Sequence, residues 1–402
     1  MTKVTYTILK SLLLFLFLIT LPGCGSDSIT DEPAPPKPPQ PVLPPTAVDR
    51  TVLVYMAADN NLSNYALKDI AEMKTGASCL PGLQGGRLLV YHAAPGTRPR
   101  LIEINPDGSE TQLATYPEGG SVTIARMRRV IDDTRSAAPA RDYGLVLWSH
   151  ATGWLNDYGV IDDSDLYRQY TPMSFGSDGT DRSKMKIKSL ARALDGQHWS
   201  FIYFDCCHMA TVEVAYELRH LTDIIVASPT ELGVEGMPYD INVPYFFKSV
   251  PDMKQAARNT FNSYADGLVE KSYGCSISVI DTSVLDELAE ITKAVYASGA
   301  SAPQNYSPIP YFRSIVMSTG IFDMHHHISS LDCDPELKSR WTEAFNKTVT
   351  LKMSTPTVYG LKADEFHGLG SNIVNTKAQA NVYDYTDTSW WTDVMSVRFN
   401  NN

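Results

Sequence analysis

The chain has 402 residues, of which 43% are hydrophobic, 10% aromatic and 20% charged. This composition is typical of a globular protein with a sizeable core, arranged as one large domain or two smaller ones at about 100–200 residues per domain. The net charge of −11 argues against a nucleic-acid partner, which usually needs a basic surface.

The first 24 residues have the pattern of an export signal. Lys3 and Lys10 precede the apolar run Ser11-Leu-Leu-Leu-Phe-Leu-Phe-Leu-Ile-Thr20, which is typical of a signal peptide rather than a membrane span. The run is followed by Leu21-Pro-Gly-Cys24, which resembles a bacterial lipobox; an ordinary secretory signal with a chance cysteine is the alternative. We predict a lipoprotein signal peptide over residues 1–24. The mature protein is then exported and anchored to a bacterial envelope, on the periplasmic side or the cell surface, through lipidation of Cys24.

The next segment, residues 25–49, is rich in proline and is predicted to be a semi-extended tether. The six cysteines lie at positions 24, 79, 206, 207, 275 and 333. Removing Cys24 leaves five, an odd number that indicates at least one free thiol. No spacing resembles a disulfide framework or a zinc site, and we expect no metal ligands.

From residue 50 to about 300, apolar runs that predict buried strands alternate with helical patterns. The predicted strands begin at Thr51, Arg87, Gly144, Phe201, Asp223 and Ser276. Helices are predicted over 62–73, with Asn60 or Asn61 near the cap, and over 121–136, 185–194 and 211–218. This alternation predicts an α/β fold with a mostly parallel central sheet covered on both faces.

Two regions depart from the alternation. Residues 97–116 alternate apolar and polar side chains around Asn105-Pro-Asp-Gly108, which predicts an inserted β-hairpin. Residues 301–402 are less regular and are predicted to form a C-terminal extension or a small subdomain after a domain spanning 50–300. The run His325-His-His327 within them is interpreted as a solvated loop.

Candidate catalytic groups follow the third and fourth apolar runs. Ligands of open α/β sheets bind outside the carboxyl ends of the strands. The third run ends in Trp148-Ser-His150, and the fourth in Phe204-Asp-Cys-Cys-His208. An imidazole beside a thiol is the arrangement that a cysteine nucleophile needs. The cysteines also precede a helix, whose N-terminus favours a thiolate. A structural histidine and a buried, inert cysteine remain the alternative from position alone.

Four ordered blocks resemble the clostripain family of cysteine peptidases. They are Thr51-Val-Leu-Val-Tyr-Met-Ala-Ala-Asp-Asn-Asn-Leu62, Leu145-Val-Leu-Trp-Ser-His-Ala-Thr-Gly-Trp154, the stretch 204–218 and Ala227-Ser-Pro-Thr-Glu-Leu-Gly-Val-Glu-Gly236. The resemblance implies a caspase-like α/β/α sandwich and a His/Cys dyad. Matching Asp205 and Met209 to the family pattern makes Cys207 the nucleophile, with Cys206 at a small-residue position, and makes His150 the general acid/base.

The resemblance also raises questions around the dyad. The backbone N–H groups of Ala151 and Cys207 are expected to bind the oxyanion. Ala151 stands where the family usually has glycine, so activity is reduced or the loop needs no positive φ. His208 stands where an apolar residue is usual. We favour His150 over His208 as the base, because His208 belongs to the turn before a helix.

Specificity and processing are implied in the same way. Asp205 matches an acid that lines the family's pocket for a basic side chain, and Glu235 or Glu231 is the candidate second acid. Helix capping by Asp205 and plain loop charges at Glu231 and Glu235 are the alternatives. Family members are often zymogens cleaved after a basic residue between the His and the Cys; Arg168, Arg182, Lys184, Lys186 and Lys188 lie there.

The predicted function is therefore an endopeptidase that cleaves protein or peptide substrates after Arg or Lys, acting as a monomer. Some family members require calcium, and the acid-rich stretch 157–181 is a weak candidate site without calcium-loop spacing. We expect no other cofactor. The competing hypothesis is a weak or inactive surface lipoprotein that binds peptide or glycan, favoured by Ala151 and His208.

Overall fold

The computed structural model describes residues 47–79, 81–155, 174–180, 183–267, 273–311 and 320–399. The predicted signal peptide and tether fall almost wholly outside these residues. All described residues belong to one compact unit, Leu43–Asn402. None of its described helices has the length and apolarity that a membrane span requires.

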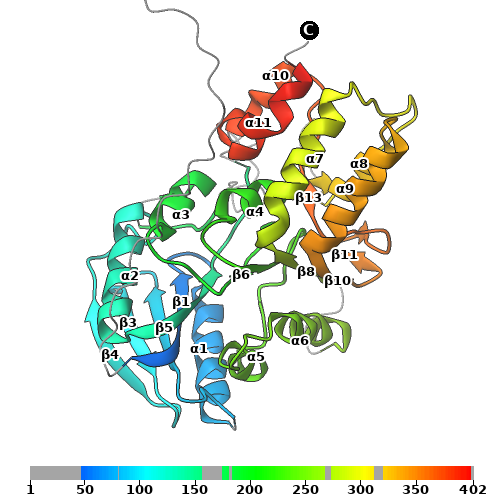
Figure 1. Cartoon of the computed structure of the whole chain (residues 1–402). Helices are drawn as coiled ribbons and strands as arrows, with labels where there is room; N and C mark the ends of the chain where they lie inside the picture. Colours follow the sequence, from blue (N-terminus) through cyan, green and yellow to red (C-terminus); the bar gives the residue numbers. More distant parts are fainter. Residues whose placement is uncertain are drawn as a thin grey trace, which may run out of the picture. The chain divides into compact units, whose positions relative to one another are not determined.

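A nine-stranded sheet forms the centre of this unit, in the order β10-β8-β7-β6-β5-β1-β2-β3-β4 (Figure 1). The middle of the sheet is parallel, and its strands are β1 (Val48–Ala57), β2 (Arg87–Ala93), β5 (Ala140–Trp148), β6 (Phe201–Asp205) and β7 (Ile224–Ala227). These strands coincide with the first five predicted apolar runs. The predicted α/β fold with a mostly parallel sheet is therefore confirmed.

Antiparallel strands complete both edges of the sheet. The predicted hairpin is present as β3 (Arg100–Ile104) and β4 (Glu110–Thr115), and its turn contains Gly108 at φ +78°. At the other edge, β8 (Ser276–Asp281) runs antiparallel to β7, and β10 (Val349–Ser354) runs antiparallel to β8. The region after residue 300 thus contributes a strand to the central sheet.

Helices cover both faces of the sheet because the central strands are apolar on both sides. In β1, Val52, Val54 and Met56 pack on one face, and Leu53, Tyr55 and Ala57 pack on the other. The first face is covered by α1 (Ser63–Ser78), α5 (Tyr239–Phe246) and α6 (Met253–Ala265). The second is covered by α2 (Ile124–Ala137), α3 (Ile187–Leu194), α4 (Val212–Leu218) and α7 (Leu285–Ala297), with the short 3-10 helix η1 (Thr282–Val284) before α7.

The remaining elements are β9 (Phe322–Asp323), α8 (Met324–Ser330), α9 (Pro335–Thr348), β11 (Thr357–Val358), β12 (Leu361–Lys362), β13 (Gly370–Ser371), α10 (Lys377–Ala380), η2 (Val382–Asp387), α11 (Ser389–Asp393) and η3 (Met395–Phe399). Several of them pack beside α4 and α7: α11 contacts both helices (Figure 1), β13 contacts α4, and α9 and η3 contact α7. The interpretation of residues 325–327 as a solvated loop was wrong. They lie on α8, and His327 is buried against the rings of Tyr296 and Tyr306.

Candidate active site

The sheet register places His150 and Cys207 at equivalent positions of neighbouring strands. Trp148, the last residue of β5, is paired with Asp205, the last residue of β6. His150 and Cys207 each follow two residues later. Since parallel neighbours lie about 4.8 Å apart, the two loops leave the same edge of the sheet side by side.

The two loops are in direct contact beyond that edge. Gly153 adopts φ +67°, and a Cβ atom there would lie 2.6 Å from the carbonyl oxygen of His208. The His150 carbonyl accepts a 2.9 Å hydrogen bond from the Gly176 amide, and the Ser149 hydroxyl donates to the Ala57 carbonyl at 2.7 Å. The loop that carries His150 is therefore fixed between the end of β1 and the Cys207 loop.

Cys207 is half-buried and its sulfur faces the backbone of Leu232. The Leu232 amide donates to Sγ at 3.4 Å, and Sγ lies 3.7 Å from the Leu232 carbonyl oxygen. Burial raises the pKa of the Cys207 thiol to about 12, and the nearby Glu231 and Asp205 charges act in the same direction. We expected a lowered pKa from the following helix. In this form burial outweighs that effect, and the thiol is protonated at neutral pH.

His150 is held by Asn61, in the loop that follows β1. The Nε2 atom of His150 lies 2.7 Å from the Oδ1 atom of Asn61. With the amide oxygen as acceptor, Nε2 carries the proton and Nδ1 is the basic nitrogen. Burial lowers the pKa of His150. In this form, at neutral pH, His150 is thus a neutral imidazole and Cys207 a neutral thiol, and each is hydrogen-bonded to another group.

Sequence reasoning missed this role of Asn61. It considered Asn60 and Asn61 only as helix caps, yet Leu62 is the N-cap residue of α1 and makes no side-chain capping bond. Asn60 accepts from the Leu62 amide at 2.9 Å, whereas the Asn61 side chain is exposed and turned to His150. The available signal was the position of Asn61 just beyond a parallel strand next to β5.

The neighbours of Cys207 are buried in ways that suit structural roles. Cys206 is 4% exposed, and its sulfur lies 3.8 Å from the Leu147 carbonyl oxygen in the core on the α4 face. His208 is 3% exposed with φ +60°, and its Nδ1 lies 3.3 Å from the Pro229 carbonyl oxygen. Burial lowers the pKa of His208 to about 4. Neither residue is placed to replace Cys207 or His150.

Ala151 is buried behind His150 and pairs with Phe175 in an isolated antiparallel bridge. It is absent from the described residues with positive φ. Of the two consequences we considered for the missing glycine, the geometry favours a loop that has no need of a left-handed residue.

Asp205 lies beneath the loop 232–238. It is 4% exposed, and its carboxylate accepts hydrogen bonds from the Met237 amide at 3.1 Å and the Tyr239 hydroxyl at 2.9 Å. Gly236, at φ +62°, covers it so closely that a Cβ there would lie 2.7 Å from both carboxylate oxygens. Burial raises the pKa of Asp205 to about 7.

A second buried carboxylate, Asp69, was missed by sequence reasoning. It lies on the sheet-facing side of α1 and accepts a 2.7 Å hydrogen bond from the Trp148 indole. Burial, followed by the charges of Asp205 and Glu72, raises its pKa to about 9. The signal was an acidic residue between the apolar positions Ala66 and Met73. Acidic groups are thus concentrated below the Cys207 loop.

The two other predicted pocket acids lie on the same loop as Leu232. Glu231 is half-buried, and burial raises its pKa. Glu235 is half-buried, and its Oε2 atom has no hydrogen-bond partner. Glu231 and Asp205 are therefore close enough to Cys207 for their charges to act on its thiol, and of the three acids only Asp205 has donors bound to its carboxylate.

Some predicted features fall outside the described residues. Cys24, Arg168 and Arg182 do so, as does most of the acid-rich stretch 157–181. Among the residues that are described, no group of three or more His, Cys, Asp or Glu side chains is arranged to hold a metal ion. Cys79, Cys206, Cys207, Cys275 and Cys333 are all free thiols.

Comparison with known proteins places this geometry in a family. The clostripain family matches residues 54–394. Clostripain from Hathewaya histolytica is 25% identical over 225 residues, 47% of this chain, and the match spans only 40% of the clostripain chain.

Solved structures match over greater lengths. An inactive zymogen C11 protease from Parabacteroides distasonis is 30% identical with a TM-score of 0.72, covering 88% of this chain and 99% of that one. A secreted C11 cysteine protease from Bacteroides thetaiotaomicron, solved with an irreversible peptide inhibitor, is 29% identical with a TM-score of 0.71. The match covers 86% of this chain and 99% of that one. The chain, with His150 and Cys207 at paired strand ends, belongs to the clostripain family of cysteine proteases.

Proposed function

We propose that this protein is a cysteine endopeptidase that cleaves peptide bonds after Arg or Lys. The observation that carries the proposal is the equivalent placement of His150 and Cys207, two residues beyond the paired positions Trp148 and Asp205. A base and a thiol on adjacent loops are the two groups that nucleophilic catalysis by a cysteine needs.

In the proposed reaction, His150 takes the proton of Cys207 and the thiolate attacks the scissile carbonyl. The amide groups of Ala151 and Cys207 stabilise the oxyanion. The protonated His150 then donates to the leaving amine, and the acyl-enzyme is hydrolysed by a water that His150 activates. The Asn61 carbonyl oxygen keeps the imidazole in one tautomer through these steps.

Specificity for a basic side chain is supported by the acids around Cys207. Asp205, Glu231 and Glu235 provide negative charge on the side of the loop 231–236, where a guanidinium or ammonium would be recognised. Asp205 is covered in this form, so the proposal requires loop 232–238 to shift when substrate binds. The raised pKa of the thiol fits a resting form that becomes competent after that shift.

We further propose that the chain matures by self-cleavage after a basic residue between His150 and Cys207, among Arg168, Arg182, Lys184, Lys186 and Lys188. Of these, Lys186 forms ion pairs with Asp384 at 2.9 Å and Asp387 at 3.3 Å. Export, lipid anchoring at Cys24 and a monomeric state belong to the same proposal, which needs no cofactor; calcium is only a weak candidate. Export is supported by the secreted relative and by the N-terminal sequence.

The decisive experiment incubates the purified protein with fluorogenic peptides ending in Arg, Lys or Leu. Turnover of the basic peptides is expected in the parent and in the control Cys206→Ala, and is expected to be lost in Cys207→Ala and His150→Ala. The same samples, with and without a calcium chelator, are examined by intact mass. A single uncut chain in Cys207→Ala beside two fragments in the parent supports self-cleavage. If the parent turns over none of the three peptides even in the presence of calcium, the hypothesis of a non-catalytic surface lipoprotein replaces the endopeptidase proposal.

A further inference from the structure

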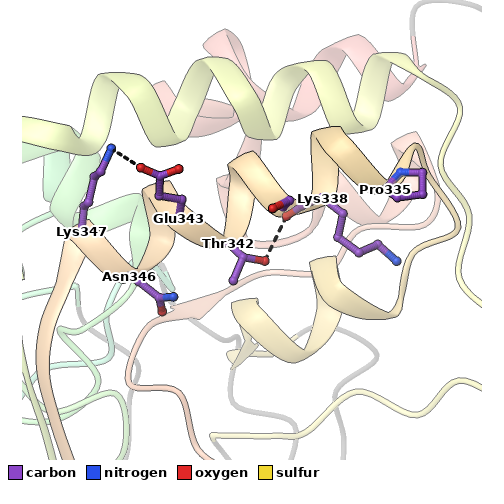
Figure 2. A pocket seen from close by; sticks show the side chains of 7 residues that line it. Pro335, Lys338, Thr342, Glu343, Asn346 and Lys347 are labelled. Atoms are coloured by element: carbon purple, nitrogen blue, oxygen red, sulfur yellow. Dashed lines mark hydrogen bonds and ion pairs between the residues drawn. The ribbon is translucent and has the colours of Figure 1, made fainter.

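One hollow among the described residues, away from His150 and Cys207, is only a helix surface. It has a volume of about 670 Å³ and is lined by seven residues, all on α9. Figure 2 shows their side chains on one side of that helix, where Lys347 pairs with Glu343 at 2.9 Å. None of the seven is buried. This surface offers no built site.

The second cavity lies between α3, α4 and the end of η2, and has a volume of about 280 Å³. The described residues that line it are Trp154, Lys186, Ile187, Lys188, Ser189, Arg192, Glu213, Glu217, Asp387 and Thr388. Neither His150 nor Cys207 is among them. Trp154, however, follows His150 by four residues, so the cavity adjoins the loop that carries the base.

Two of its lining side chains are fully buried and each has an atom without a hydrogen-bond partner. Trp154 and Glu213 are each 1% exposed, and the unpartnered atoms are Nε1 of Trp154 and Oε2 of Glu213. The other carboxylate oxygen of Glu213 accepts three hydrogen bonds, from the Ser371 hydroxyl, the Asn372 amide and the Tyr385 hydroxyl. Buried polar atoms in folded proteins nearly always have partners. Other described buried atoms also lack one, such as Nε1 of Trp199, but Trp154 and Glu213 line the cavity, where a ligand would satisfy them.

The same two atoms define what the ligand must offer. An indole N–H only donates, so the ligand needs an acceptor there, and a carboxylate oxygen needs a donor. Tyr385 connects the two walls, because its ring packs against Trp154 at 4.6 Å between centroids while its hydroxyl donates to Glu213.

Charges near the cavity mouth indicate the ionic form of that ligand. Lys188 and Arg192 lie one turn apart on α3, and neither side chain pairs with an acid among the described residues, whereas Lys186 is neutralised by Asp384 and Asp387. Glu217 contributes a negative charge from α4. A carboxylate is attracted by Lys188 and Arg192. An ammonium group is attracted by Glu217 and, once it has lost its proton, by Glu213, because burial raises the pKa of that carboxyl to about 7.

From these features, we propose that this cavity binds a free amino acid or a dipeptide through its carboxylate and its ammonium group. The volume lies just below the range typical of drug-sized ligands, which fits a compact zwitterion. Binding there would add a contact to the His150 loop through Trp154. The inference rests on the cavity and stands or falls separately from peptidase activity.

The test measures binding of alanylalanine to the full-length Cys207→Ala protein by calorimetric titration, so that turnover plays no part. Saturable binding is expected, weakened roughly two- to tenfold in Trp154→Phe, which loses one hydrogen bond. The charge reversal Lys188→Glu is expected to weaken it about fivefold or more. Lys188 is not buried, so this variant reports on the site even if the buried change at Trp154 disturbs folding.

Two controls separate the site from general effects. Lys347→Ala, on the outer face of α9, is expected to bind alanylalanine as the parent does. The N-acetylated and amidated dipeptide, which lacks both charges, is expected to bind at least about fivefold more weakly. The proposal is overturned by an absence of saturable binding up to about 10 mM, or by equal affinity of the charged and capped dipeptides or of the parent and Lys188→Glu.

Discussion

The Asn61 amide oxygen lies 2.7 Å from Nε2 of His150, across the loops that follow two adjacent parallel strands, β1 and β5. This contact fixes the imidazole tautomer and ring orientation. We predict that Asn61→Ala lowers kcat about tenfold or more with a smaller change in KM, since a displaced base slows proton transfer. Asn61→Asp should move the acidic limb of the kcat/KM profile to higher pH, because a carboxylate beside an imidazole raises its pKa.

Asn64→Ala is the matched control for both variants. Asn64 is also exposed and lies on the first turn of α1, with no hydrogen bond to the dyad. Its substitution should leave kcat and the pH profile unchanged, and all three variants should melt within about 2 °C of the parent because exposed changes have small effects. An unaltered pH profile in Asn61→Asp means that the contact has no part in catalysis.

The sequence predicted the central strands because both faces of the sheet are covered, which makes β1, β5 and β6 continuous apolar runs. It did not predict β10. That strand lies at an edge of the sheet, where its residues are half-buried or exposed and its Val-Thr-Leu-Lys-Met-Ser sequence carries a mixed pattern. The burial of β10 is set by its position at the edge of the sheet, and the local sequence does not specify that position.

The candidate site also has features that the local sequence specifies and features that depend on distant residues. The placement of His150 and Cys207 just beyond adjacent strands was predictable, because apolar runs and local motifs specify it. Asn61 and Asp69 carried local signals, but their hydrogen-bond partners were not predictable, since His150 and Trp148 are 89 and 79 residues distant in sequence. The direction of the Cys207 pKa shift was also missed. It depends on how deeply loop 232–238 buries the sulfur, which the helix following the cysteine does not reveal.

Asp205→Asn tests the specificity assignment. It removes the charge and keeps one oxygen to accept from the Met237 amide, while the new NH2 group faces the Tyr239 hydroxyl, which can rotate to accept from it. We predict that kcat/KM for Arg- and Lys-terminated peptides falls about 100-fold, as expected when a buried charge pair is broken. Turnover of a Leu-terminated peptide should change less than about threefold. An equal loss for all three substrates would show that Asp205 only supports the loop. Glu336→Gln, on exposed α9, is the charge-matched control.

Glu213 makes folding stability depend on pH. Burial raises its pKa from 4.5 to about 7, so the folded state binds the proton more tightly than the unfolded chain. The favourable contribution of the protonated carboxyl is complete below pH 4.5 and is lost as pH rises to about 7. The total change is on the order of 3 kcal/mol.

Glu213→Gln should therefore make the dependence of unfolding free energy on pH shallower between 4.5 and 7, measured by urea unfolding at half-unit intervals; the slope that remains comes from groups such as Asp205 and Asp69, whose pKa values are also raised. Glu336→Gln again serves as the exposed control and should leave the slope as it is in the parent. A slope in Glu213→Gln equal to the parent's assigns the dependence to another group, of which Asp205 is the first to examine because its pKa is raised in the same range.

Gly153 determines whether the His150 and Cys207 loops can remain in contact. In Gly153→Ala the new methyl group meets the His208 carbonyl oxygen at 2.6 Å, in addition to the cost of φ +67° for a residue with a side chain.

Gly196→Ala is the matched control, because its φ is +87° but nothing lies within 4 Å of the added atom. Both variants carry the backbone cost of about 1 kcal/mol. Only Gly153→Ala should lose a further 1–3 kcal/mol or so of stability, together with at least about tenfold in kcat, as the loops separate. Equal stability and equal kcat in the two variants would mean that the loops accommodate the methyl group and that their contact does not set the dyad geometry.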